Sequence, residues 1–324
     1  MLSKPELKEI LERVILAQGN SFIKELARSH GIKIGANKDE FRTNLNAAID
    51  NGELDQEKIE AWLAEVEGWG NQHFYLYEAP AISSEDLVTR IKGSAHAALL
   101  GSGISFDFAD ELRLTAILVD HERLSMVWQQ GKDRWSRYKQ KDFTEEEGNE
   151  FYRFEAYLRH GERSIVRFEW RFEDAFCGIL IHRNKEIKHA EAIAQVWKEV
   201  AATGVAPARL PSISLNEAVK TKSKGEGAQS SRFDNDEGYV EMGSKKADGG
   251  IDEIEAVRQA REGLDDEAFD DTRGMFHYKA DGGKLSVAIS VQVFGKEGCL
   301  RLWARCLRSD VYQLVRSILD ANQA

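Results

Sequence analysis

Cysteines are few in this sequence and fit no disulfide framework. The three cysteines, Cys177, Cys299 and Cys306, are odd in number and form no C-x-x-C pair. Small secreted domains stapled by disulfides carry paired, closely spaced cysteines instead. The cysteine content therefore excludes a disulfide scaffold and favours a reducing compartment.

Long apolar runs are also absent. No stretch approaches the roughly 20 apolar residues of a membrane-spanning helix. The first twenty residues carry a charge every few positions, which is unlike a signal peptide. We expect a cytoplasmic protein with no membrane partner, a location that is compatible with association with the nucleoid.

Positive charges are fewer than negative ones, 44 lysines and arginines against 55 acidic residues. The formal net charge is −11, and affinity for phosphate depends on lysine and arginine. Contact with nucleic acid would therefore have to come from a local basic surface and not from the field of the whole chain.

Motifs for catalysis, metals or cofactors are missing as well. The eight histidines form no H-x-x-x-H, H-E-x-x-H or cysteine–histidine cluster, and there is no P-loop, G-x-S-x-G or G-x-G-x-x-G. We expect a protein that is not an enzyme and that binds neither a metal nor a cofactor. A nuclease with dispersed site residues remains an alternative.

The residues that are present have the balance of a globular protein. The 42% of hydrophobic residues is enough for sizeable cores, and 324 residues correspond to two or three domains. Near the start of the chain, apolar residues at three- and four-residue spacing predict helices. These helices are expected at about 5–18, 21–29, 37–51 and 55–66.

After a strand or connecting arm at 73–77 and a helix at 84–100, the apolar period changes to two. This alternation is typical of antiparallel strands with one buried face. The predicted strands are 112–120, 123–129, 151–159, 164–172 and 178–182, followed by a helix at 190–202. Three more strands, 274–280, 284–294 and 299–306, lie between helices at 251–262 and 309–321.

The composition of residues 203–250 differs from the rest, because it contains little apolar material. Such a segment predicts a flexible linker. The expected fold class is thus α+β, with four parts along the chain. They are a helical module at 1–72, an α+β unit at 78–202, the linker at 203–250 and a second α+β unit at 251–324.

The two α+β units resemble each other when the sequence is shifted by 122 residues. Six identities in 37 positions are weak evidence alone, but the strand–turn–strand–helix order and the apolar phase also agree. We predict two similar units in a TBP-like or helix-grip-like arrangement, an analogy of fold that carries no function. The identical pairs are Gly161/Gly283, Ser164/Ser286, Phe172/Phe294, Cys177/Cys299, Leu180/Leu302 and Arg183/Arg305.

Residues 21–46, SFIKELARSHGIKIGANKDEFRTNLN, carry a specific pattern of apolar, glycine and charged positions. The pattern residues are Leu26, Gly31, Ile32, Lys38, Glu40, Phe41 and Leu45. At these positions the segment, about a tenth of the chain, resembles the SAP family of small helix–extended loop–helix DNA-binding modules. Two positions depart from the family pattern: Gly35 stands one place early, and Asn44 stands where a basic residue is common.

The resemblance implies contact with a DNA backbone at the start of the second helix. Free backbone N–H groups and the positive end of the helix dipole suit a phosphate there. The alternative is that the start of this helix is a capping box, with Asn37 as N-cap and Glu40 three residues on. The residues predicted to bind nucleic acid in this module are Lys24, Arg28, Lys33, Asn37, Lys38 and Arg42.

A second basic stretch lies between two predicted strands. It interleaves basic and aromatic residues, as nucleic-acid surfaces with stacking platforms do. A solvated hairpin loop is the alternative. The candidate residues are Arg134, Trp135, Arg137, Lys139 and Lys141.

We therefore expect a non-enzymatic DNA-associated protein. Its SAP-like module would contact the DNA backbone with little sequence specificity, and its α+β body would bind a protein partner. The alternatives are a protein-interaction scaffold or subunit without DNA contact, and the nuclease named above.

Overall fold

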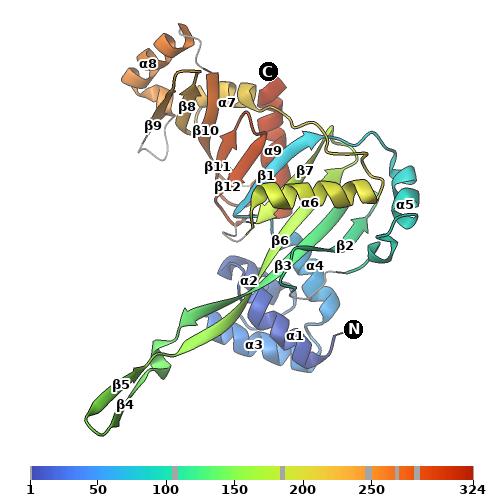
Figure 1. The fold of residues 1–324 in the computed structure, drawn as a ribbon, viewed down its shortest axis with the longest axis vertical. Helices are drawn as coiled ribbons and strands as arrows, with labels where there is room; N and C mark the ends of the chain where they lie inside the picture. Colours follow the sequence, from blue (N-terminus) through green and yellow to red (C-terminus); the bar gives the residue numbers. More distant parts are fainter. Residues whose placement is uncertain are drawn as a thin grey trace. The chain divides into compact units, whose positions relative to one another are not determined.

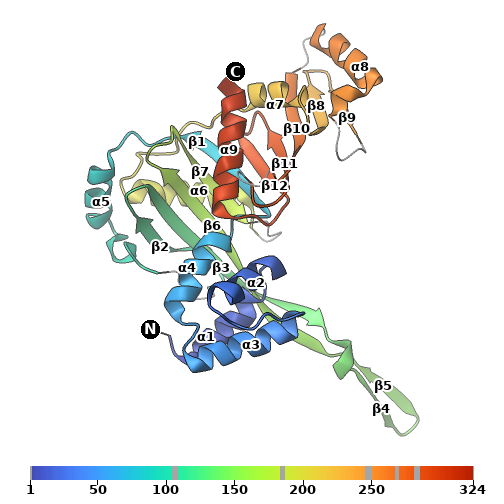
Figure 2. The same ribbon diagram turned by 180° about the vertical axis from the view of Figure 1, so that it is seen from behind.

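The computed structural model describes residues 2–103, 109–182, 187–244, 250–266, 270–280 and 285–323, with side chains at all of these except 132–134, 136, 158–162, 265 and 266. The chain is an α+β protein, as predicted, in which helices precede and flank a large antiparallel sheet (Figures 1 and 2). Among the described helices, none is long and apolar enough to cross a bilayer.

The chain divides into two compact units. The first contains residues 1–63, 104–113 and 129–164, and the second contains 64–103, 114–128 and 165–324. This division differs from the expected one, in which the helices stood alone. The reason is that two strands, β3 (Arg123–Arg137) and β6 (Tyr157–Arg171), are fifteen residues long and run through both units.

The N-terminal helices form where the apolar spacing predicts them. Ser3 and Glu6 form a capping box at the first helix, and Gly52 ends a later one in the left-handed conformation. The side chains of Leu11, Ile23 and Phe41 are fully buried between these helices. The elements are α1 (Lys4–Ile10), the π-helical η1 (Leu11–Ile15), α2 (Asn20–Ser29), α3 (Lys38–Asn51) and α4 (Gln56–Val66).

The sheet has ten strands in the order β2-β3-β6-β7-β1-β12-β11-β10-β8-β9. Its central strand, β1 (Gln72–Glu78), pairs antiparallel with β7 on one side and with β12 on the other. The remaining strands are β2 (Arg113–Val119), β7 (Phe176–His182), β8 (Ala228–Asp234), β9 (Tyr239–Gly243), β10 (Asp270–Tyr278), β11 (Ile289–Phe294) and β12 (Cys299–Leu302).

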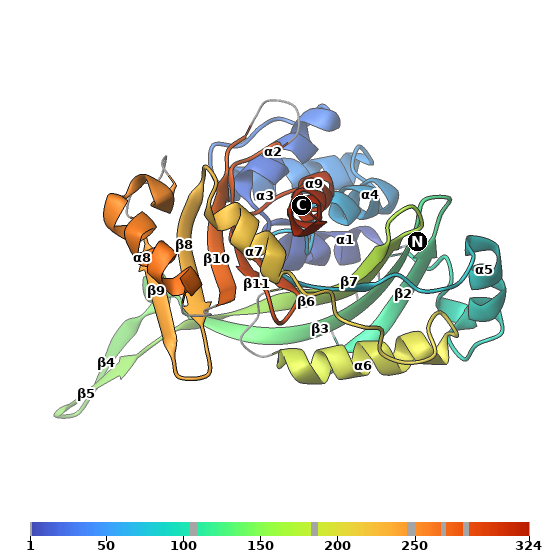
Figure 3. The same cartoon turned by 90° about the horizontal axis from the view of Figure 1, so that it is seen from above.

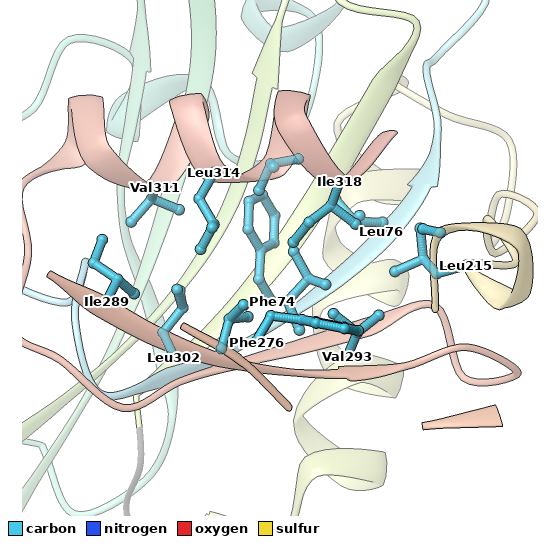
Figure 4. Close-up of a cluster of buried hydrophobic side chains, with 14 of the residues drawn as sticks. Phe74, Leu76, Leu215, Phe276, Ile289, Val293, Leu302, Val311, Leu314 and Ile318 are labelled. Atoms are coloured by element: carbon cyan, nitrogen blue, oxygen red, sulfur yellow. The ribbon is translucent and has the colours of Figure 1, made fainter. Parts of the chain in front are cut away.

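Helices cover opposite faces of the two halves of this sheet. Trp197 of α6 (His189–Ala202) packs edge-on against Tyr77 and Phe168, which lie on one face. On the other face, α7 (Asn216–Ser223) and α9 (Arg308–Gln323) enclose a large hydrophobic core (Figure 4). Viewed from above, α6 and α9 lie on the two sides of the sheet (Figure 3). The other helices are α5 (Ser84–Lys92) and α8 (Glu255–Asp266).

Residues 203–250 are not the structureless linker that their composition predicted. They contain α7, β8 and β9. The prediction failed because small and polar residues are buried here: Ser231 Oγ donates a hydrogen bond of 2.6 Å to the Asp271 carboxylate inside the sheet. A polar segment can enter a core when its polar groups are paired.

The order β6–β7–α6 is followed later in the chain by β11–β12–α9, with β7 and β12 on either side of β1. The elements before these triplets differ, since β9 and α8 lie between β8 and β10, whereas only residues 120–122 separate β2 from β3. Arg183 and Gly283, which belong to the aligned pairs, lie outside the described residues. The duplication therefore stays a prediction.

Gly178 of β7 gives a test of the central packing. The ring of Phe74 from β1 lies directly over its backbone, so a Cβ at this position would overlap the ring. Overpacking a well-filled core costs about 1–3 kcal/mol. We expect Gly178→Ala to lower the free energy of unfolding by that amount in urea denaturation.

The matched control is Gly243→Ala on β9, where the nearest heavy atom would be 3.6 Å from the new Cβ. This change should alter stability by less than about 0.5 kcal/mol. Equal stability of both variants would contradict the packing described for β1 and β7.

Candidate binding surfaces

Lys38, the central basic residue of the SAP-like pattern, is engaged inside the helical module. Its Nζ donates a hydrogen bond of 2.6 Å to the backbone oxygen of Leu16, just after η1. The last carbonyls of a helix lack partners within it, and a lysine can satisfy one of them. Lys38 thus ties the start of α3 to the end of η1.

The start of α3 is capped by its own side chains. Asn37 Oδ1 accepts a hydrogen bond of 2.9 Å from the Glu40 backbone nitrogen, which confirms Asn37 as the N-cap. Glu40 Oε2 accepts one of 3.0 Å from the Ala36 nitrogen. A carboxylate therefore occupies the helix end where the resemblance to SAP modules implies a phosphate.

The two departures from the SAP pattern have structural explanations. Gly35 lies against the first turn of α3, where a Cβ would come within 2.6 Å of the Phe41 nitrogen. Asn44 Nδ2 donates a hydrogen bond of 2.9 Å to the backbone oxygen of Lys33 and so holds the loop against the helix. Both residues serve the loop conformation of this chain.

The remaining basic residues of the module divide into paired and unpaired ones. Arg42 Nε lies 2.7 Å from Glu12 Oε1, and Arg42 also forms an ion pair with Asp39. Arg28 lies 3.6 Å from Glu25. Lys24 and Lys33 are exposed, and the described residues offer them no ion pair. Two of the six predicted residues thus remain open to a ligand.

The second predicted patch lies on a two-stranded projection of the chain. Residues 135–157, here called the arm, turn through a short 3-10 segment, η3 (Lys139–Lys141), into the hairpin of β4 (Phe143–Glu147) and β5 (Glu150–Phe154) (Figure 1). β4 and β5 pair only with each other among the described strands, from Phe143 opposite Phe154 to Glu147 opposite Glu150.

Arg137 organises the base of the arm. Its guanidinium donates two hydrogen bonds to the Asp142 carboxylate, one of them 2.8 Å long, and lies 2.9 Å from Glu155. Asp142 also accepts a hydrogen bond of 3.0 Å from the Ala156 nitrogen. The hydrogen bonds from Arg137 and from Ala156 hold the pKa of Asp142 below its usual range. Arg137 is thus committed to a contact within the arm.

The arm carries most of the exposed apolar side chains. Seven of the eleven large hydrophobic side chains that are exposed among the described residues belong to it, and the most exposed, Phe151, has 72% of its surface accessible. Lys139 and Lys141 are exposed and form no ion pair with a described side chain, and the side chain of Arg134 lies outside the described residues. The seven are Trp135, Tyr138, Phe143, Phe151, Tyr152, Phe154 and Tyr157.

The tip of the arm was missed by the sequence reasoning, which expected a loop and one strand there. The pattern that could have predicted the two strands is the occurrence of aromatic residues on both faces of the hairpin. Phe143 and Phe154 stack at 4.6 Å on one face, and Phe151 lies on the other. Every residue of β4 and β5 is exposed. A strand without a buried face indicates a segment that lies away from the core.

The cysteines are not suited to nucleophilic chemistry. All three are buried, and burial raises the pKa of Cys299 and of Cys306 to about 12, so that the thiolate is scarce. Tyr75 Oη lies 2.7 Å from His189 Nδ1 near Cys299. Within the described part of the chain, no three histidine, cysteine or acidic side chains are grouped to hold a metal.

Comparison with known proteins gives no relative: neither a protein family nor a curated protein matches this chain.

Lys38 provides the test of the helical module. Lys38→Met keeps the length of the side chain but removes the hydrogen bond to Leu16, and a bond from a charged donor contributes about 1.5–3 kcal/mol. Because Lys38 is exposed to solvent, we expect a smaller loss, about 1 kcal/mol of the free energy of unfolding, in thermal or urea denaturation. Lys33→Met, the control at an unpaired lysine, should leave stability unchanged. A result in which both variants are equally stable would show that Lys38 has no structural role.

Proposed function

We propose that this chain is a non-enzymatic binding protein whose arm docks onto another protein surface. The observation that carries the proposal is the collection of exposed aromatic side chains on the arm. Isolated two-stranded hairpins are marginally stable in water, and contiguous exposed apolar patches on soluble proteins mark interaction sites. Tyrosine, tryptophan and arginine are also the side chains that contribute most to protein interfaces.

The charges of the arm favour a protein over a nucleic acid. Between Asp142 and Glu155 there are six acidic residues and one basic residue, Arg153. The carboxylates of Glu145 and Glu146 are exposed on β4 and would repel phosphates, and Arg137 is neutralised by Asp142. The contacts therefore support the scaffold hypothesis more than the predicted nucleic-acid patch.

Site-specific photocrosslinking tests the arm in its native cell. A benzophenone side chain placed at Phe151 in the full chain should form a covalent adduct with a protein, because this position is exposed and lies near the turn of the hairpin. The adduct would be detected by its mass after denaturing electrophoresis. The control is the same probe at Val240, an exposed position on β9.

We expect an adduct at position 151 and none at position 240. A second variant carries Phe151→Ala, with the probe moved to Phe143. If the Phe151 side chain contributes about 1.4 kcal/mol to binding, the yield of the adduct should fall about tenfold. No adduct from either arm position would overturn the proposal.

A second candidate function is contact with a DNA backbone by the helical module. Its support is narrower: Lys24 of α2 and Lys33 in the loop between α2 and α3 are exposed and form no ion pair with a described residue. In residues 1–63 there are nine basic and eleven acidic residues, so such binding would be weak and sensitive to salt.

The double variant Lys24→Glu/Lys33→Glu separates this second candidate from the first. If both lysines contact phosphates, this variant should lose affinity for a fluorescent duplex. The logarithm of the binding constant should also fall less steeply with the logarithm of the salt concentration for Lys24→Ala/Lys33→Ala than for the wild type, by a slope of roughly 2. Fluorescence anisotropy at low salt measures both. Lys139→Glu/Lys141→Glu is the control on the arm. Wild-type protein that fails to bind at low salt would dispose of this candidate.

A further inference from the structure

The two strands at the tip of the arm have outer edges of different character. β5 pairs with β4 along one edge, and no described strand pairs with its other edge. Unpaired N–H and C=O groups on such an edge are a template for a strand from another chain. The same is true of β4, so the side chains decide which edge is used.

β4 has the composition of a protected edge. It reads FTEEE, and the consecutive carboxylates of Glu145, Glu146 and Glu147 point to both of its faces. Pairing β4 with a second β4 would place like charges opposite one another, which destabilises a sheet. Charged residues on edge strands are a known protection against unwanted pairing.

β5 has the opposite composition. It reads EFYRF, with one acidic residue, one basic residue and three aromatic residues, and all five are exposed. The ion pair of Arg153 with Glu155 is long, 3.7 Å, and the Arg153 side chain is 72% exposed. This strand is neutral, rich in aromatic residues and free along one edge.

We propose that β5 pairs antiparallel with β5 of a second copy of this chain, with Tyr152 on the two-fold axis. The inference rests on the proposed role of the arm and names its partner. In this register Tyr152 lies opposite Tyr152 of the second copy. Phe151 lies opposite Arg153, and Glu150 lies opposite Phe154.

In this register the side chains of the two β5 strands complement each other, and this favours a second copy of the chain as the partner of the free β5 edge. Phe151 and Arg153 share one face of β5, so each copy offers an aromatic ring to the guanidinium of the other, in both directions across the axis. Aromatic pairs and cation–aromatic pairs directly opposite one another stabilise antiparallel strands. β4 lies on the outside of both hairpins, where its carboxylates face solvent.

The pairing also turns two marginal hairpins into one four-stranded sheet. Phe143, Tyr152 and Phe154 share the other face of the hairpin, and the two-fold axis brings six aromatic rings onto that face of the joined sheet. Three or more strands with a common apolar face are stable where a lone hairpin is not. Because the contact is the same on both copies, it closes as a dimer.

Cysteine crosslinking of the full chain tests the register. Residues opposite each other in antiparallel strands have Cα atoms about 4.5–5.5 Å apart, within the range of a disulfide. Tyr152→Cys on the axis should therefore form a covalent dimer of twice 36.6 kDa under mild oxidation. The three native cysteines are buried and should contribute little background.

Thr144→Cys on β4 is the matched control, since it is also exposed and lies on the same hairpin. We expect at least tenfold less covalent dimer from this variant. Equal crosslinking from Thr144→Cys and Tyr152→Cys would mean random collision and would overturn the inference.

Sedimentation of the unmodified chain gives an independent measure. The mass of the wild type should rise with concentration from 36.6 kDa toward a dimer and no further. Arg153→Glu, which replaces the guanidinium opposite Phe151 with a carboxylate, should abolish the rise. A monomer at all concentrations, or open-ended polymers, would contradict the two-fold pairing.

The photocrosslinking result separates this inference from the proposed function. An adduct of the Phe151 probe with a different protein, together with no dimer from Tyr152→Cys, would leave the arm as a docking element and exclude self-pairing. An adduct with a second copy of the chain supports both.

Discussion

Strand β1 supplies side chains to hydrophobic layers on both faces of the sheet, and the arrangement of the second unit depends on it. Phe74 and Leu76 point to the core under α9, whereas Tyr77 meets Trp197 of α6 on the opposite face. Because successive side chains of a strand alternate, one strand can anchor two helices only if they lie on opposite sides. The packing of Phe74 requires a glycine at position 178 of β7, since the Phe74 ring occupies the space that a side chain there would need.

Much of the fold could be predicted from apolar spacing. The helix at 190–202 and the strand at 178–182 agree with α6 and β7 to within two residues, because each has one face in a core. The segment 203–250 could not be predicted, because Ser231 and Asp271 enter the core as a hydrogen-bonded pair and a paired polar group leaves no hydrophobic signal. The strand order could not be predicted either, since β1 pairs with residues that follow it by 98 to 110 positions in β7 and by more than 200 positions in β12.

The contacts of the candidate binding residues could be predicted where the partners are close in the sequence, and not where they are far apart. The N-cap at Asn37 was visible in the sequence because its partner, Glu40, is three residues away. The bond from Lys38 to Leu16 spans 22 residues, and the contact of Arg42 with Glu12 spans 30, so neither could be deduced from spacing. A basic residue in a motif can be judged as a ligand contact only once its partners within the protein are known. In this module, Lys24 and Lys33 are the predicted residues that remain as candidates.

The position of β1 also has a consequence for the synthesis of the chain. More than 200 residues separate β1 from β12, and a ribosome adds about 5–20 residues per second, so β1 waits for about 10–40 seconds before that partner strand exists. During this interval the edge that β12 will cover is an open template, flanked by the apolar surfaces of Phe74 and Leu76. During translation, β1 is thus exposed to mispairing along this edge until β12 has been made.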